Sequence, residues 1–239
     1  MIDLSLKDKT VFITGATRGI GDAVAAAFKE SGAKVIGTGT SKKTNGNFDE
    51  YFRADFSNLD EIYNCANYLK GIRPDILINN AGIGKNSPFT EIDPATFLLM
   101  HQVNVFAPFI LCQAAVPFMK NNSWGRIVNL SSIFGKISKA HRASYSATKF
   151  ALDGLTLSLA SEYARDGILA NCIAPGFTDT ELTRRMLSAD DLKNIILSVP
   201  IGRMANVNEI ANFILWLSSP MNSYITGQNI AIDGGFSRV

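Results

Sequence analysis

The chain has 239 residues, of which 46% are hydrophobic and 18% are charged, and its formal net charge is +2. This composition predicts an ordinary soluble globular protein, and the scattered basic residues form no stripe that would indicate nucleic-acid binding. Three distant cysteines set among apolar neighbours predict reduced, buried thiols, and only two histidines are present, so no metal site is expected.

The chain shows no Pro/Ser-rich linker, low-complexity run or internal repeat, which predicts a single domain over residues 1–239. The N-terminus carries neither a secretory nor a mitochondrial targeting pattern, and we expect no later run to approach a membrane span. We therefore expect a cytoplasmic protein that has no membrane partner.

Short apolar runs bounded by Gly, Asn, Ser or Pro predict strands that are buried on both faces. They cover residues 11–13, 34–36, 76–78, 126–130, 169–173 and 229–232. Helical patterns lie between them, for example over 23–30, 95–119, 146–165 and 209–217. This alternation predicts an α/β fold with a doubly wound parallel sheet of about seven strands and helices on both faces. Ligands then bind at the carboxyl ends of the strands.

Directly after the first predicted strand, Gly15, Gly19 and Gly21 lead into a helix. Glycines at such a turn let the backbone approach a pyrophosphate at the helix N-terminus. A glycine triplet alone also fits a generic turn. The three residues between the first two glycines depart from the G-x-G-x-x-G spacing and indicate one branch of the dinucleotide-binding folds.

The segment after the second strand contains no carboxylate where an NAD-binding protein would hold the ribose 2′-hydroxyl. Arg18, Thr40, Ser41 and Lys42 could instead hold a 2′-phosphate. Lys42 and Lys43 also fit a solvated loop, so the missing acid carries more weight. We expect NADPH to be preferred over NADH.

Four polar elements follow: residues 79–82 after the predicted strand at 76–78, Asn104 within a helix, Ser132 after the strand at 126–130, and Tyr145 with Lys149. Each alone also fits a turn, a helix surface or a loop. Tyr145 and Lys149 lie one helical turn apart, so the ammonium favours the ionised phenol. We expect Tyr145 to protonate a carbonyl oxygen that the Ser132 hydroxyl orients, while a nicotinamide supplies the hydride.

Together these motifs, with residues 175–176 and 232–235, resemble the short-chain dehydrogenase/reductases over essentially the whole chain. Residues 32–38 and 224–227 look most like the bacterial 3-oxoacyl-acyl-carrier-protein reductases. The resemblance implies a Rossmann-type sheet and hydride transfer between NADP(H) and a carbonyl or secondary alcohol. It also implies a homotetramer built through the two long central helices and the C-terminal strand.

The expected catalytic residues are Asn104, Ser132, Tyr145 and Lys149, and the resemblance implies that Asn104 holds a water linking Lys149 to solvent. The resemblance assigns Asp55 and Phe56 to the adenine, residues 80–82 to the ribose side, and Thr178 with Thr180 to the nicotinamide end. The expected cofactor contacts are Gly15, Thr17, Arg18, Ile20, Thr40, Ser41, Asp55, Phe56, Asn80, Ala81, Gly82, Tyr145, Lys149, Pro175, Gly176, Thr178 and Thr180.

The expected substrate is a small molecule or acyl thioester, most simply a 3-oxoacyl thioester. Docking of acyl-carrier protein stays open, because the positions that match two basic docking residues of such reductases are Ser123 and Asp166. Lys120 and Arg165 lie nearby and could compensate. Residues 177–200 are expected to form a mobile cover, and its candidate apolar residues also fit ordinary helix packing: Met186, Leu187, Ile195 and Ile196.

Two other functions remain open. The first is a dehydrogenase of a polyol, sugar, dihydrodiol or steroid-like alcohol. The second is a non-catalytic cofactor sensor or scaffold, which would not need the Ser132, Tyr145 and Lys149 set. The residues before Tyr145 could recognise an anionic or polar substrate or form a solvated loop: Lys136, Lys139, His141 and Arg142.

Overall fold

The computed structural model describes residues 4–42, 45–186 and 189–238, so Lys43 and Leu187 lie outside the described residues. These residues form a seven-stranded sheet in the order β3-β2-β1-β4-β5-β6-β7, and every neighbouring pair is parallel. The predicted doubly wound sheet is therefore confirmed. The strands are β1 (Thr10–Ile13), β2 (Lys34–Gly39), β3 (Glu50–Arg53), β4 (Ile76–Asn79), β5 (Gly125–Leu130), β6 (Ile168–Pro175) and β7 (Asn229–Ile232).

The edge strand β3 has no counterpart among the apolar runs of the sequence. All four of its residues are half-buried or exposed, so it lacks the apolar signature of a central strand. The connection from β2 to β3 has no helix in its described part, residues 40–42 and 45–49. This short connection leaves the carboxyl end of β2 close to β3.

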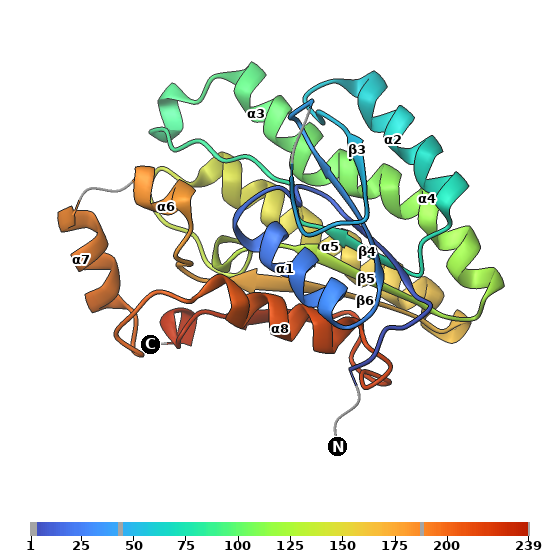
Figure 1. The fold of residues 1–239 in the computed structure, drawn as a ribbon. Coiled ribbons are helices and arrows are strands. Elements are labelled where there is room, and N and C mark those ends of the chain that lie inside the picture. Colours follow the sequence, from blue (N-terminus) through green and yellow to red (C-terminus); the bar gives the residue numbers. More distant parts are fainter. Residues whose placement is uncertain (1–3, 43–44, 187–188, 239) are drawn as a thin grey trace.

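Helices cover both faces of the sheet (Figure 1). On one face, α1 (Gly19–Glu30) packs against α8 (Val207–Ser218), over the side chains of Val11 and Ile13. On the other, α2 (Leu59–Ile72) packs against α4 (Ala107–Asn121), over Phe12, and α5 (Ala143–Tyr163) lies against β6. The alternation of β1 between the two cores is the period-2 pattern of a doubly covered strand.

The long helix predicted over 95–119 is divided into α3 (Pro94–His101), a π-helical turn η2 (Gln102–Phe106) and α4. The stretch Pro94–Asn121 is long and apolar enough to cross a membrane, by length and composition only. The core helix of a globular protein also meets this criterion, so one such stretch is weak evidence of a membrane span. In the fold, α4 packs on α2 and contacts β4, β5 and β6, so one side of this helix belongs to the core.

The short helices α6 (Glu181–Met186) and α7 (Ala189–Ser198) lie beyond one end of the sheet (Figure 1). They follow β6 and so stand near the carboxyl edge, as expected for a cover. Four single turns complete the described secondary structure: η1 (Phe89–Glu91), η3 (Ile133–Gly135), η4 (Ala164–Asp166) and η5 (Phe236–Arg238).

Candidate active site

The glycine turn joins β1 to α1. Gly15 and Gly19 have φ of 66° and 58°, which favours glycine at both positions. A Cβ on Gly21 would lie 2.1 Å from the Gly15 carbonyl oxygen, so only glycine fits. Arg18 caps α1 without a side-chain hydrogen bond to the helix start, which leaves the first N–H groups of α1 available. The turn therefore fits an anionic pyrophosphate.

The end of β4 braces this turn. The Asn80 side-chain amide donates to the carbonyls of Thr14 and Gly15, at 2.9 and 3.0 Å. In return the Thr14 hydroxyl oxygen accepts from the N–H groups of Asn80 and Ala81, both at 2.9 Å. These bonds fix the glycine turn relative to the residues after β4.

Tyr145 lies half-buried in the first turn of α5, and Lys149 one turn later is 4% exposed. The Lys149 ammonium donates to the Leu130 carbonyl at 2.6 Å and lies 5.5 Å from the centre of the Tyr145 ring. An ammonium has three donors, and this is its one hydrogen bond to the described residues. Two donors therefore remain for a ribose or an ionised phenol.

Ser132 follows β5 and is 8% exposed. Its hydroxyl oxygen accepts from the Phe134 N–H at 3.2 Å, because the side chain caps η3. The hydroxyl proton is not used by this bond, and it can be donated to a substrate oxygen.

Asn104 lies on the π-helical turn and is 1% exposed. Its oxygen accepts from the Ile83 N–H at 2.9 Å, and its amide donates to the Ile83 carbonyl at 2.8 Å and to the Thr148 hydroxyl at 3.0 Å. Thr148 in turn donates to the Tyr145 carbonyl at 2.7 Å. Asn104 thus joins the loop after β4 to the helix that carries Tyr145. The expected water relay stays a prediction.

Gly82, which follows β4, lies close to the side chains of Asn104 and Lys149. A Cβ there would lie 3.3 Å from the Asn104 side-chain oxygen and 3.6 Å from the Lys149 ammonium. A Cβ on Gly84 would lie 3.1 Å from the Tyr145 ring. The backbone after β4 therefore approaches all three side chains closely.

The adenosine end is expected at the carboxyl edge of β2 and β3. Thr17 lies beside Gly39, where a Cβ would meet its methyl group at 2.7 Å. Thr40 and Ser41 follow and are exposed, as is Arg18. The Asp55 carboxylate accepts from the N–H and hydroxyl of Ser57, and these bonds lower the pKa of Asp55.

The remaining predicted contacts lie on α1, between β3 and α2, and at or after the end of β6. Ile20 packs half-buried against the core, and Phe56 is buried. Pro175 ends β6, and the Gly176 N–H donates to the Ile232 carbonyl at 2.9 Å. Thr180 crosses to the glycine turn, since a Cβ on Gly19 would meet its methyl group at 3.6 Å. The Thr178 hydroxyl donates to the Gly176 carbonyl.

Known proteins match this chain along nearly its full length. A family model described as enoyl-(acyl carrier protein) reductase matches residues 15–237. A 3-oxoacyl-[acyl-carrier-protein] reductase from Salmonella typhimurium is 36% identical, over 99% of this chain and 100% of its own length. The chain belongs to the short-chain dehydrogenase/reductase family. It is thus an NAD(P)-dependent oxidoreductase that acts on CH–OH groups or the corresponding carbonyls.

Other members of the family act on different alcohols. A 3α-hydroxysteroid dehydrogenase from Mediterraneibacter gnavus is 35% identical, over 97% of this chain and 98% of its own. The structure of a gluconate 5-dehydrogenase from Burkholderia cenocepacia in complex with NADP and tartrate aligns with a TM-score of 0.92 at 27% identity, covering 99% and 98% of the two chains. The fold is therefore shared across several substrate classes.

In this short-chain dehydrogenase/reductase, the basic residues near Tyr145 differ in the contacts that hold them. Lys136 donates to the Asn229 carbonyl at 2.7 Å, so this loop lysine is tied to β7. The Arg142 guanidinium lies 4.8 Å from the centre of the Phe134 ring, is half-buried, and has no hydrogen-bond or ion-pair partner among the described residues. Burial lowers the pKa of Arg142. The Lys139 ammonium lies over the same Phe134 ring, 5.8 Å from its centre.

The two positions expected to bear on carrier docking, Ser123 and Asp166, stand elsewhere. They lie in the turns before β5 and β6, at the amino ends of these strands. Lys120 is ion-paired with Asp166 at 3.2 Å. These residues therefore form no basic surface at the carboxyl edge that carries Tyr145.

Sequence reasoning missed several supporting residues. Thr148 links Asn104 to Tyr145, and the Tyr-x-x-x-Lys pattern gives it no special weight. Tyr51 and Arg53 bond the loop after β2. Their spacing of two on a strand, which places both side chains on one face, is the signal that could have found them.

The three cysteines are buried, as predicted. Burial raises the pKa of each thiol to about 12. Within residues 4–42, 45–186 and 189–238, no group of three or more His, Cys, Asp or Glu side chains could hold a metal ion.

Proposed function

We propose that this chain reduces 3-oxoacyl thioesters with NADPH, through Ser132, Tyr145, Lys149 and Asn104. The observation that carries the proposal is the convergence of a phenol, a buried ammonium and a serine hydroxyl at the carboxyl edge, beside an open glycine turn. The full-length similarity to the Salmonella 3-oxoacyl reductase supports the substrate class.

NADP is the cofactor, and residues of this chain fit it. The close approach at Gly21 and the uncapped start of α1 suit a pyrophosphate, with Gly15, Thr17, Arg18 and Ile20 around it. No carboxylate occupies residues 40–42, and the relative from Burkholderia holds NADP. The other proposed contacts are Thr40, Ser41, Asp55, Phe56, Asn80, Ala81, Gly82, Tyr145, Lys149, Pro175, Gly176, Thr178 and Thr180.

The protein residues divide the reaction between them. The nicotinamide, when bound, supplies a hydride to the carbonyl carbon. Tyr145 transfers its phenolic proton to the carbonyl oxygen, which becomes the hydroxyl of the product. Ser132 donates a hydrogen bond to the same oxygen and so stabilises its developing charge. Lys149 stabilises the phenolate that remains, and Asn104 holds the loop and helix in register.

A steady-state substrate panel tests this proposal. Acetoacetyl thioesters of coenzyme A and of acyl-carrier protein are compared with enoyl thioesters, gluconate and a 3α-hydroxysteroid, each with the NADP and NAD forms. We expect the highest kcat/KM for acetoacetyl thioesters with NADPH. A higher value for an enoyl thioester or an alcohol would overturn the substrate class, and a preference for NADH would overturn the cofactor.

A second candidate is a dehydrogenase of a carboxylate-bearing hydroxy acid. It is favoured by Arg142, because a half-buried guanidinium without a carboxylate partner, one helical turn before Tyr145, suits an anionic substrate group. Gluconate is therefore the decisive arm of the panel. If gluconate is oxidised fastest, Arg142→Gln should raise its KM with little effect on kcat.

We also propose that residues 1–239 act as one domain within a cytoplasmic homotetramer. Only 39% of the most apolar window of Pro94–Asn121 is buried within a single chain. Apolar side chains on α4 and α5 are exposed as well, including Phe109 at 37%, Phe150 at 47% and Leu157 at 58%. A second copy would cover them. Light scattering tests the assembly, and a monomeric mass would overturn it.

A further inference from the structure

The segment after β2 is held by two side chains of the edge strand β3. The Tyr51 hydroxyl donates to the Ser41 carbonyl at 2.8 Å, and the Arg53 Nε donates to the Thr40 carbonyl at 3.1 Å. Tyr51 and Arg53 are two residues apart on a strand, so they act from the same face. Two consecutive carbonyls are therefore drawn toward β3.

The hydrogen bonds to the Thr40 and Ser41 carbonyls fix the direction of the neighbouring N–H groups. In a planar trans peptide the N–H points opposite to the carbonyl of the same unit. The N–H groups of Ser41 and Lys42 thus point away from β3, and neither donates a hydrogen bond to a described residue. Two successive N–H groups without a partner among the described residues, together with the Thr40 and Ser41 hydroxyls, are donors suited to an anion.

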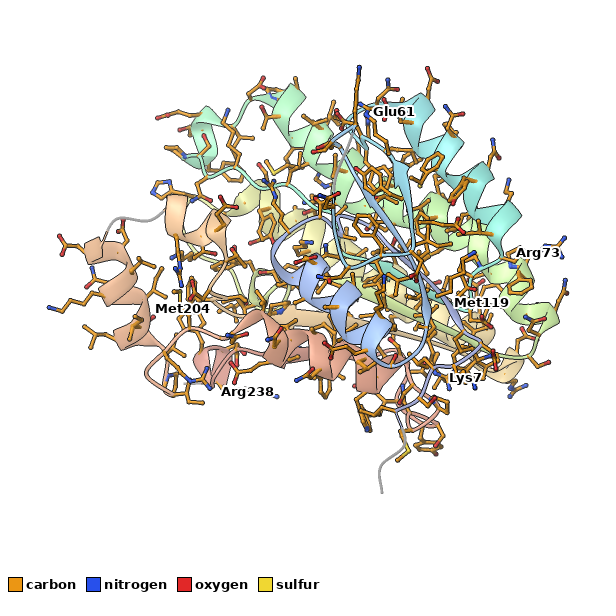
Figure 2. The ribbon with its side chains drawn as sticks, in the orientation of Figure 1. Lys7, Glu61, Arg73, Met119, Met204 and Arg238 are labelled. Atoms are coloured by element: carbon orange, nitrogen blue, oxygen red, sulfur yellow. The ribbon has the colours of Figure 1, made fainter. Side chains whose placement is uncertain are left out.

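A third side chain extends the arrangement toward the adenine end. Arg53 Nη1 bonds both oxygens of Glu61, at 2.8 and 2.9 Å, and Glu61 accepts from the Asp55 N–H at 2.7 Å. Glu61 stands in the first turns of α2, near the end of β3 (Figure 2). Because Arg53 touches both Thr40 and Glu61, it links the segment after β2 to the segment after β3.

We propose that Tyr51, Arg53 and Glu61 form a clamp that presents residues 40–42 to the 2′-phosphate of NADPH. The three are positioning residues, which act through the backbone they hold. The clamp rests on the proposed use of NADP, since donors suited to an anion at residues 40–42 serve a 2′-phosphate and not a 2′-hydroxyl. The clamp makes the edge strand β3, which carries Tyr51 and Arg53, partly responsible for the preference for NADPH over NADH.

The test measures binding of adenosine fragments, so it does not depend on catalysis. Affinities of 2′,5′-ADP and 5′-ADP are measured by isothermal titration calorimetry for the wild type, Tyr51→Phe and Arg53→Lys. Tyr51→Phe removes only the hydroxyl and keeps the ring against Phe48, whose centre lies 5.3 Å away. Arg53→Lys keeps the positive charge but cannot bond both Thr40 and Glu61 in a fork.

We expect each variant to lower the preference for 2′,5′-ADP over 5′-ADP by about threefold to tenfold, the effect of one lost hydrogen bond, with 5′-ADP affinity unchanged. Lys34→Met is the matched control. It removes an exposed cation paired with Glu50 on the same edge of the sheet, and it should keep the wild-type preference.

Two outcomes would overturn the clamp. Wild-type preference in both variants would show that the carbonyl bonds are dispensable, and it would leave the NADP assignment intact. A wild type that binds 5′-ADP more tightly than 2′,5′-ADP would overturn the clamp and the NADP assignment together.

Discussion

The edge that carries Tyr145 and the helices α6 and α7 are built in opposite ways. Around Tyr145, buried polar groups are tied to the backbone: Lys149 to Leu130, and Asn104 to both backbone groups of Ile83. The helices α6 and α7 lie beyond the sheet instead, and Leu197 on α7 is 75% exposed. The comparison teaches that buried hydrogen bonds fix the proposed catalytic groups, while α7 leaves a large apolar side chain exposed.

The largest effect is expected at the fixed edge. Tyr145→Phe removes the proposed proton donor and should lower kcat by about a hundredfold to ten-thousandfold. NADPH binding, measured by calorimetry, should stay within a few-fold of the wild type because the glycine turn is intact. Near-normal turnover would mean that the proton comes from another group.

The glycine turn should tolerate substitution almost as poorly. In Gly21→Ala the new Cβ would lie 2.1 Å from the Gly15 carbonyl oxygen, and relieving such overpacking costs about 1–3 kcal/mol. We expect NADPH affinity to fall about tenfold or more and Tm to fall as well. Gly71→Ala on α2 is the control, because a Cβ there meets nothing within 4 Å and alanine favours a helix. Wild-type NADPH affinity in Gly21→Ala would contradict the close approach.

The buried amide chain behind the site should matter for stability. Asn129 accepts from Asn79 at 2.8 Å and donates to Thr156 at 2.8 Å, and it is fully buried. Asn129→Ala removes these two buried hydrogen bonds, so the free energy of unfolding in urea should fall by about 1–3 kcal/mol. Asn64→Ala on the exposed face of α2 should change it by less than about 0.5 kcal/mol. Equal losses of unfolding free energy in Asn129→Ala and Asn64→Ala would show that the Asn79–Asn129–Thr156 hydrogen bonds do not stabilise the fold.

The cover should respond more mildly and in a different parameter. Ile196 on α7 is half-buried, so Ile196→Ala should raise KM for an acyl thioester by about threefold to tenfold while kcat changes little. Leu197→Ala, on a largely exposed side chain, should leave KM unchanged. The reverse order would place the other face of α7 toward the substrate.

The smallest effect is expected at the three buried cysteines, whose thiols should not react in the native protein. Because burial raises the pKa of Cys65, Cys112 and Cys172 to about 12, the thiols stay protonated from pH 7 to about pH 9. The native protein should not react with a thiol reagent over this range, and denatured protein should react at all three positions. Rapid labelling of the cysteines in the native protein would show that the helices packed on the sheet move away and expose the thiols.

The central strands and the helical faces were predictable because burial on both faces leaves continuous apolar runs, as in Ile76–Asn79. The edge strand β3 was not, since its exposed residues carry no such pattern. The π-helical turn was also missed, because the apolar pattern continues through it.

The site residues could be proposed from motifs because each follows a strand end. Their supports could not, since these depend on packing between distant segments. Lys136 and Arg142 illustrate the limit: both are loop cations in the sequence, but one is tied to β7 and the other is half-buried over Phe134.

The π-helical turn at Gln102–Phe106 gives this region a strict length requirement. The Ala107 N–H bonds the Gln102 carbonyl five residues back, so this turn holds one residue more than an α-helical turn. Deleting one residue here would let the turn close as an ordinary α-helix and would remove the bulge that carries Asn104. Asn104 would then lose its approach to Ile83, even though every proposed catalytic residue remained in the chain. Insertions and deletions between positions 94 and 121 should therefore be selected against as strongly as changes in the residues that perform the chemistry.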